Sequence, residues 1–157
     1  MPSIRLAAAA AVLAACAALA LVACGGDDTD EKNDYVDAVN EVTATLNTGL
    51  TEIASSGTAV GSPKDAAKVF GDFSKTLDGA AADLEGIDPP SDVTSQHEEL
   101  VGILDQLGSE SQNAADEISQ GGAAAVTGVA TQFIGEANQL GSEADATIDE
   151  INSKLQE

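Results

Sequence analysis

Four apolar stripes, each recurring every three or four residues, run through the chain from residue 35 onward. They extend over Tyr35 to Ile53, Ala66 to Leu84, Val93 to Ile118, and Val126 to Leu155. Spacings of three and four place side chains on one face of an α-helix, and no segment shows the alternation typical of a strand. The pattern therefore predicts four amphipathic helices.

These stripes also predict how the helices pack. A sustained alternation of three and four is the seam pattern of helices that cross at about 20°. The breaks at residues 55–61, 86–90 and 121–122 are short, so successive helices are expected to run antiparallel. We predict an all-α fold, an antiparallel up-down-up-down four-helix bundle over residues 34–157, whose fourth helix is the longest. A helical hairpin that dimerises is the alternative, because it would bury the same stripes between two chains.

Several helix ends carry local signals. Ser62 is a suitable N-cap with Pro63 at the first helical position, and Gly86 suits the end of the second helix. Pro89 and Pro90 are expected in the first turn of the third helix, where prolines are tolerated. Eight glycines lie inside the proposed helices, at positions 49, 71, 79, 102, 108, 128, 135 and 141. Each is expected to cost about 1 kcal/mol relative to alanine.

The first 23 residues have the organisation of a secretory signal peptide. A short segment containing Arg5 precedes a run from Leu6 to Val22 that is mostly alanine. A permanent membrane span needs about 20 strongly apolar residues. The run is shorter and weaker than that, which favours a cleaved leader.

Leu21, Val22, Ala23 and Cys24 close this run, and Gly25 follows. The four residues resemble the lipobox of bacterial lipoproteins. By that resemblance the chain is cut before Cys24, whose thiol receives a covalent diacylglyceryl group, while acylation of the new N-terminal amine stays open. No other cofactor is expected. The protein would then sit on the extracytoplasmic face of the plasma membrane. The competing interpretation is an ordinary signal peptide that happens to contain a cysteine. It is weakened because no cysteine follows Cys24.

Residues 24–33 are polar, contain two glycines and lack an apolar period, so we expect a lipidated cysteine followed by a flexible acidic tether. The chain has 27 acidic and 6 basic residues among 157, a formal net charge of −21. Such a surface repels phosphate backbones, which excludes nucleic acid as a partner. The expected partners are the membrane, through the lipid, and an envelope protein that docks on an acidic face or on the fourth helix.

His97 is the only histidine, and it occupies a position in the third apolar stripe. It is either a metal ligand or proton-linked switch, or a partly buried imidazole that is hydrogen-bonded near one end of the core. No metal site is predicted, since a di-iron bundle needs Glu-x-x-His on two helices and the chain has one His. There is also no Gly-x-Ser-x-Gly or Ser-x-x-Lys motif. We therefore expect no catalytic residues and no enzyme.

A second resemblance concerns the mature part. Ile87-Asp88-Pro89-Pro90-Ser91 followed by His97-Glu98-Glu99-Leu100 is similar to a pattern in small helical lipoproteins of actinobacteria, whose function is largely unassigned. The resemblance implies a helical fold and an envelope location. We expect a non-enzymatic interaction or accessory module. The alternative is a lipoprotein that binds a small ligand or cation in a pocket between helices near His97.

Overall fold

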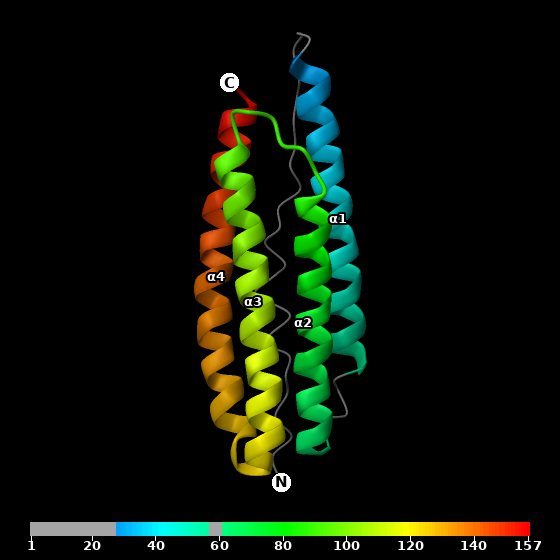
Figure 1. Ribbon diagram of the computed structural model, residues 1–157, viewed down its shortest axis with the longest axis vertical. Coiled ribbons are helices and arrows are strands. Elements are labelled where there is room, and N and C mark those ends of the chain that lie inside the picture. The colour runs from blue at the N-terminus through cyan, green and yellow to red at the C-terminus, as the bar shows by residue number, and fades with distance from the viewer. Residues whose placement is uncertain (1–27, 57–60) are drawn as a thin grey trace.

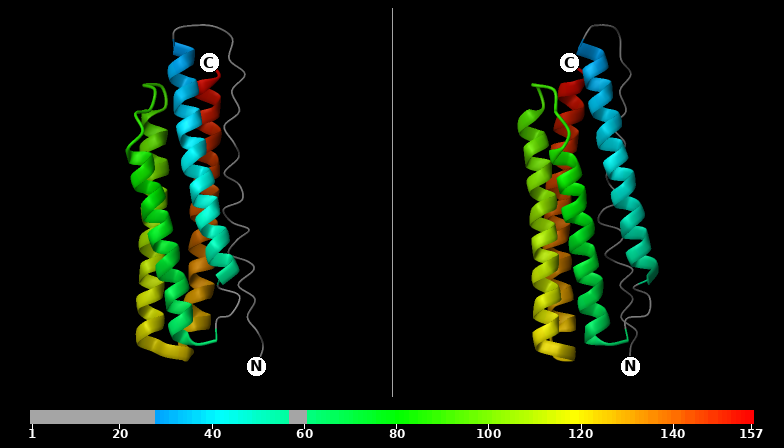
Figure 2. Two further views of the ribbon diagram at one scale, coloured as in Figure 1. Left: turned by 90° about the vertical axis from the view of Figure 1, so that its right-hand side faces the viewer. Right: turned by 45° about the vertical axis from the view of Figure 1, so that its right-hand side comes forward.

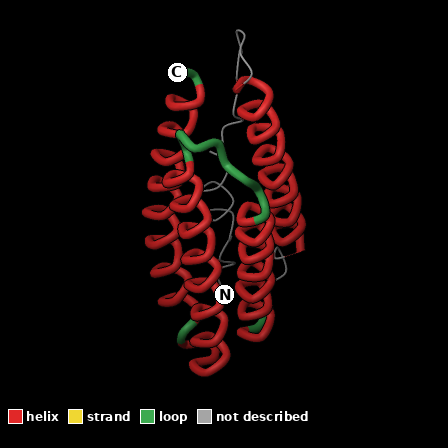
Figure 3. The backbone as a smooth tube through the Cα atoms, turned by 45° about the horizontal axis from the view of Figure 1, so that its top comes forward, coloured by secondary structure: helices red, strands yellow, loops and turns green. Residues whose placement is uncertain are grey.

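The computed structural model describes residues 28–56 and 61–157. It contains four long helices and one short 3₁₀ turn: α1 (Asp28–Ser56), α2 (Pro63–Glu85), α3 (Thr94–Gly121), η3 (Gly122–Ala124) and α4 (Val126–Leu155). Successive helices run in opposite directions and are connected by short loops where the structure describes the connection (Figures 1 and 3). The predicted all-α, up-down-up-down four-helix bundle is confirmed, within one chain.

The predicted apolar stripes form the core. In the third stripe every predicted member, from Val93 to Ile118, is buried. Val36, Val101, Ile103 and Val129 are also buried, although the stripes did not include them. These additional positions are expected for helices in a bundle, which bury a face wider than a two-position seam.

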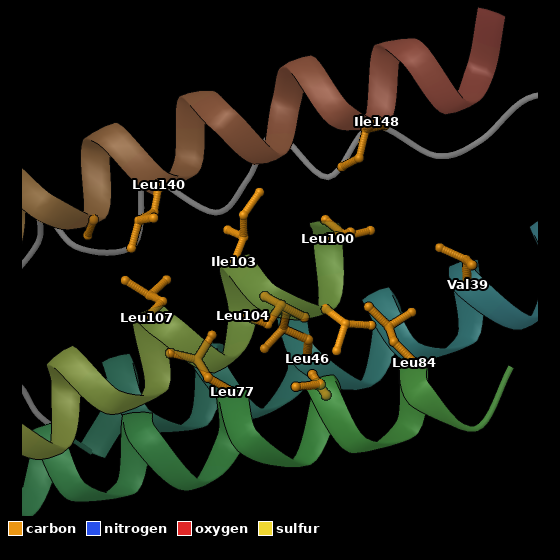
Figure 4. Close-up of a cluster of buried hydrophobic side chains, with 14 of the residues drawn as sticks. Val39, Leu46, Leu77, Leu84, Leu100, Ile103, Leu104, Leu107, Leu140 and Ile148 are labelled. Atoms are coloured by element: carbon orange, nitrogen blue, oxygen red, sulfur yellow. The ribbon is translucent and has the colours of Figure 1, made fainter. Parts of the chain in front are cut away.

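The core changes in character along the bundle axis. At the end where α2 and α4 begin, the rings of Phe70 and Phe73 meet that of Phe133 edge to face, with centroids 5.1 and 5.7 Å apart. The middle is aliphatic and includes Leu77, Leu104 and Leu107 (Figure 4). The other end, where α1 and α3 begin, contains the buried polar side chains of Tyr35 and His97. We call this last region the Tyr35–His97 end.

The expected tether is partly wrong. Residues 28–33, predicted as linker, form the first turns of α1. Asp30 and Glu31 lie in the first turn, where negative charge interacts favourably with the helix dipole. Lys32 donates from Nζ to the carbonyl of Leu155 at 3.4 Å, which attaches this turn to the end of α4. Residues 24–27 lie outside the described part of the chain.

The second helix begins as predicted. Ser62 is its N-cap, and its Oγ accepts a hydrogen bond from the Asp65 amide at 3.2 Å, with Pro63 in the first turn. The start of α3 differs from the prediction. Pro89 and Pro90 precede the helix, which begins only at Thr94. His97 therefore lies in the first turn of α3, where the prolines were expected.

The fourth helix is the longest of the described helices, as predicted, but by a single residue. It has 30 residues and α1 has 29, because α1 begins earlier than predicted. No helix within residues 28–56 and 61–157 is long and apolar enough to cross a membrane.

The helix glycines fall into two groups. A Cβ on Gly71, Gly79, Gly102, Gly128 or Gly135 would meet nothing within 4 Å. At Gly49 the same atom would lie 2.7 Å from Cγ2 of Thr76, and at Gly108 it would overlap the carboxylate of Asp78. Gly49 therefore permits a close approach of α1 to α2, whereas the first group has no packing reason for glycine.

The four seams between neighbouring helices are unequal. The α2–α3 and α3–α4 pairs pack closely along their length, α1 packs less extensively on α2, and α1 and α4 scarcely contact each other. The right view of Figure 2 shows α1 leaning away from the rest of the bundle toward its C-terminal end. Consistent with this, Leu50 and Ile53 near that end are only partly buried.

Candidate functional site

The Tyr35–His97 end holds the most unusual chemistry in the core. His97 is 4% exposed and Tyr35 is 2% exposed, and their rings meet edge to face with centroids 5.7 Å apart. The Tyr35 hydroxyl lies 3.2 Å from His97 Nδ1. On the other side of the ring, His97 Nε2 lies 3.1 Å from the carbonyl oxygen of Leu84. The imidazole thus links α1, α2 and α3.

The carbonyl determines which nitrogen carries the proton. A carbonyl oxygen can only accept, so His97 Nε2 must be protonated and donate to Leu84. In the neutral ring Nδ1 is then an acceptor, and the Tyr35 hydroxyl donates to it. Both ring nitrogens and the phenol are therefore satisfied, as buried polar groups require. This arrangement corresponds to the structural interpretation of His97 that the sequence left open.

Burial also changes the acid–base behaviour of the two residues. It lowers the pKa of His97 below its ordinary 6.5, against the opposing effects of the Leu84 hydrogen bond and the Glu98 carboxylate. Burial raises the pKa of Tyr35 to about 12. Both shifts favour the neutral form, because a charge in the core loses its hydration. At neutral pH the pair is uncharged.

Further polar contacts surround the pair at the same end. Lys32 Nζ lies 3.9 Å from the Asp92 carboxylate, in addition to its contact with the Leu155 carbonyl. Gln96 donates from Nε2 to Glu150 at 3.2 Å and thereby bridges α3 and α4. Its Oε1 is buried with no hydrogen-bond partner within the described residues. Polar contacts therefore connect α1 to α3 and α4 at this end, in addition to the apolar core.

His97 is poorly placed to bind a metal. Each ring nitrogen already has a partner, so a cation would have to displace either Tyr35 or the Leu84 carbonyl. Among the residues that the structure describes, no group of three His, Cys, Asp or Glu side chains could hold a metal ion.

An apolar cavity of about 50 Å³ lies between the helices in the aliphatic middle of the core. All four helices contribute to its walls (Figure 4). Leu84 and Leu100 line it at the end nearest His97, but His97 itself does not. The structure thus has a cavity close to the position predicted for a pocket, but His97 is not part of its wall, which is nearly all aliphatic.

A shallow polar depression occurs at the opposite end of the bundle. Asn113, Asp116, Glu117 and Gln120 of α3 line it together with Gly121 and Ala125. The Asp116 carboxylate accepts a hydrogen bond from Gln112 at 3.1 Å, an exposed contact within α3. The depression is broad and open to solvent, and it has no feature that selects a ligand.

The sequence identified His97 but not its partner. Tyr35 was interpreted as an apolar stripe member, although a signal for the pairing exists. In an up-down-up-down bundle the first and third helices start at the same end. Tyr35 and His97 both stand near the start of their stripes, so they were candidates to meet. The lipobox residues, Leu21 to Cys24, lie outside the described residues, and their predicted roles remain predictions.

No protein-family model, curated protein or solved structure matches this chain. Function is therefore inferred from the chain's own residues.

Proposed function

We propose that this chain is a cell-envelope lipoprotein that is anchored through a diacylglycerol on Cys24 and acts by contact with a partner, without catalysis. The observation that carries the proposal is the order Leu21-Val22-Ala23-Cys24 after an apolar run, with no later cysteine. Two acyl chains on one cysteine are sufficient for stable membrane binding, whereas one chain gives only marginal binding.

The early start of α1 determines how such an anchor would hold the bundle. Only residues 25–27 separate Cys24 from the first residue of α1. Three residues reach at most about 11 Å. The N-terminal end of α1 would therefore stay close to the headgroups, which replaces the longer spacer expected from the sequence.

Such an attachment gives the bundle a preferred orientation. Figure 1 shows the start of α1 at the same end as the α2–α3 loop and the C-terminus. The Tyr35–His97 end would then face the membrane, and η3 would lie far from it. A helix of 29 residues is about 43 Å long, so the far end projects well beyond the headgroups.

The far end and sides of the bundle are the surfaces that this orientation leaves free for a partner. The net charge of −21 favours a basic partner and opposes contact with anionic lipid. His97 gives no support to a catalytic role, because both of its ring nitrogens are engaged in hydrogen bonds within the core.

The alternative, binding of a small ligand, receives support from one observation. The apolar cavity adjoins the position where a pocket was predicted. The occupied ring nitrogens of His97 favour an apolar ligand over a cation.

Metabolic labelling with a radioactive fatty acid tests the anchor. The wild-type chain and Cys16→Ser, a matched control with a serine in the same leader, are expected to incorporate label and remain with the membrane after a high-salt wash. Cys24→Ser is expected to incorporate none, because the acceptor thiol is gone. Equal labelling of Cys24→Ser, or no labelling of the wild type, would refute the proposal.

A further inference from the structure

The aliphatic cavity lies at the one seam of the bundle that the helices leave open. Its walls include Val39 and Leu46 of α1 on one side, and Leu140 and Ile148 of α4 on the other. The helices α1 and α4 scarcely contact each other, although the remaining neighbouring pairs are packed. The cavity therefore lies between α1 and α4, and α3 together with Leu84 of α2 forms the rest of its wall.

Small side chains on α4 are one reason the gap persists. Gly141 and Ala144 line the cavity on the α4 side, and Thr43 lines it on the α1 side. Core positions in bundles are usually filled to the density of an organic crystal. Here a glycine and an alanine stand where larger side chains would close the seam.

The dimensions of the cavity indicate the shape of its occupant. The lining residues extend from Val39 to Leu46 on α1 and from Leu140 to Ile148 on α4. At 1.5 Å per residue these stretches are about 10–12 Å long. The volume of about 50 Å³ is room for only a few waters in a row, since each needs roughly 10–15 Å³. A volume this small spread over that length is a long and narrow space, as a single hydrocarbon chain is.

The chemistry of the lining agrees with this shape. Within residues 28–56 and 61–157, no charged side chain lines the cavity, and Thr43 is the only polar one that does. Apolar cavities of this kind stay dry and accept apolar ligands. The open α1–α4 seam lets a headgroup remain in solvent. Because the chain carries a net charge of −21, an anionic headgroup would be repelled, which favours an uncharged one.

We propose that the α1–α4 seam is a binding site for one linear alkyl chain with an uncharged headgroup, with the chain lying along the axis between Val39–Leu46 and Leu140–Ile148. This proposal does not depend on the lipid anchor. The side chain at position 144 determines whether the alkyl chain can bind, because a larger group there fills the space that the ligand needs.

Binding of 1-decanol to the full chain, with the same amount of phospholipid nanodiscs in every sample whether or not the chain is attached to them, tests the proposal. The readouts are the midpoint of thermal unfolding and NMR contacts between decanol and the methyl groups of Val39 and Leu140. The wild type is expected to show saturable binding with these contacts. Decanoate is expected to bind at least ten-fold more weakly. Because every sample contains the same discs, the same fraction of decanol is lost to the lipid, and this loss cancels when the variants are compared.

Ala144→Leu is expected to weaken decanol binding at least ten-fold. Ala146→Leu, the same change at an exposed position of the same helix, is expected to leave it unchanged. Thr43→Leu fills the cavity from the α1 side and gives a second test if Ala144→Leu does not fold. The proposal is overturned if decanol makes no contact with Val39 or Leu140, or if both cavity-filling variants bind as well as the wild type. Equal weakening by Ala146→Leu would overturn it too.

Discussion

At the scale of residues, the pairing of Tyr35 with His97 explains how a core of aliphatic side chains tolerates two polar rings. Each polar atom of the pair has a partner: the hydroxyl donates to Nδ1, and Nε2 donates to the Leu84 carbonyl. A buried group left without its partner costs about 1–3 kcal/mol, whereas removal of both partners costs less. The two residues should therefore behave as a unit when they are mutated.

A double-mutant cycle measures this unit. Tyr35→Phe leaves His97 Nδ1 buried without a donor, and we expect a loss of about 1–3 kcal/mol in the free energy of unfolding. His97→Phe leaves the Tyr35 hydroxyl alone and is expected to cost a similar amount. The double variant should lose less than the sum, as measured by urea unfolding. Strict additivity of the two losses would contradict the pairing.

The lowered pKa of His97 predicts a pH dependence with a definite sign. In the unfolded chain His97 takes up a proton near its ordinary pKa of 6.5, but in the fold it does so only at lower pH. Between pH 6.5 and the lower pKa that His97 has in the fold, the unfolded state therefore binds more protons than the folded state. The free energy of unfolding decreases as the pH falls through this range.

Comparison with His97→Gln isolates the contribution of His97 to the pH dependence. The variant lacks the imidazole but keeps every carboxylate that titrates in the wild type. The difference in stability between the wild type and His97→Gln is expected to shrink from about pH 7.5 to about pH 5. Denaturant unfolding at a series of pH values gives the measurement. A difference that stays constant or grows on acidification would show that the His97 pKa is not lowered.

At the scale of elements, the helix-period stripes made the four helices predictable, because burial follows the same three-and-four spacing. Ser62 and Pro63 located the start of α2 for an equally local reason. The start of α1 was missed. Its acidic first turn has the composition of a linker. Lys32 in this turn is held by the carbonyl of Leu155, a residue far away in the sequence. The cavity was predicted only approximately, since the α1–α4 seam depends on how helices far apart in sequence approach.

The helix glycines allow a matched comparison of elements. Gly102→Ala on α3 meets no atom within 4 Å, so it is expected to stabilise the fold by up to about 1 kcal/mol. Gly49→Ala brings a Cβ to 2.7 Å from Thr76 Cγ2, so either Thr76 must turn away from its hydrogen bond to the Asp72 carbonyl or α1 must shift from α2. We expect it to be at least about 1 kcal/mol less favourable than Gly102→Ala. Thermal unfolding of both variants tests this, and equal gains would mean that Gly49 has no packing role.

At the scale of the whole molecule, a short connection between Cys24 and α1 predicts that the bundle stands with one end on the membrane. In nanodiscs with spin-labelled headgroups, amide signals of Val93 and Leu155 should broaden more than those of Gly122 and Ala124. The first two lie at the Tyr35–His97 end, and the last two belong to η3 at the other end. Equal broadening at both ends would indicate a bundle that lies flat or tumbles freely.

We expect Cys24 to become the lipidated first residue of the mature protein, and the orientation of the bundle depends on it. Mass spectrometry of the N-terminal peptide of the chain recovered from membranes tests it most directly. We predict a peptide that begins at Cys24 and carries a covalently attached diacylglycerol. A peptide that begins at any other residue, or an unmodified Cys24, would contradict the claim.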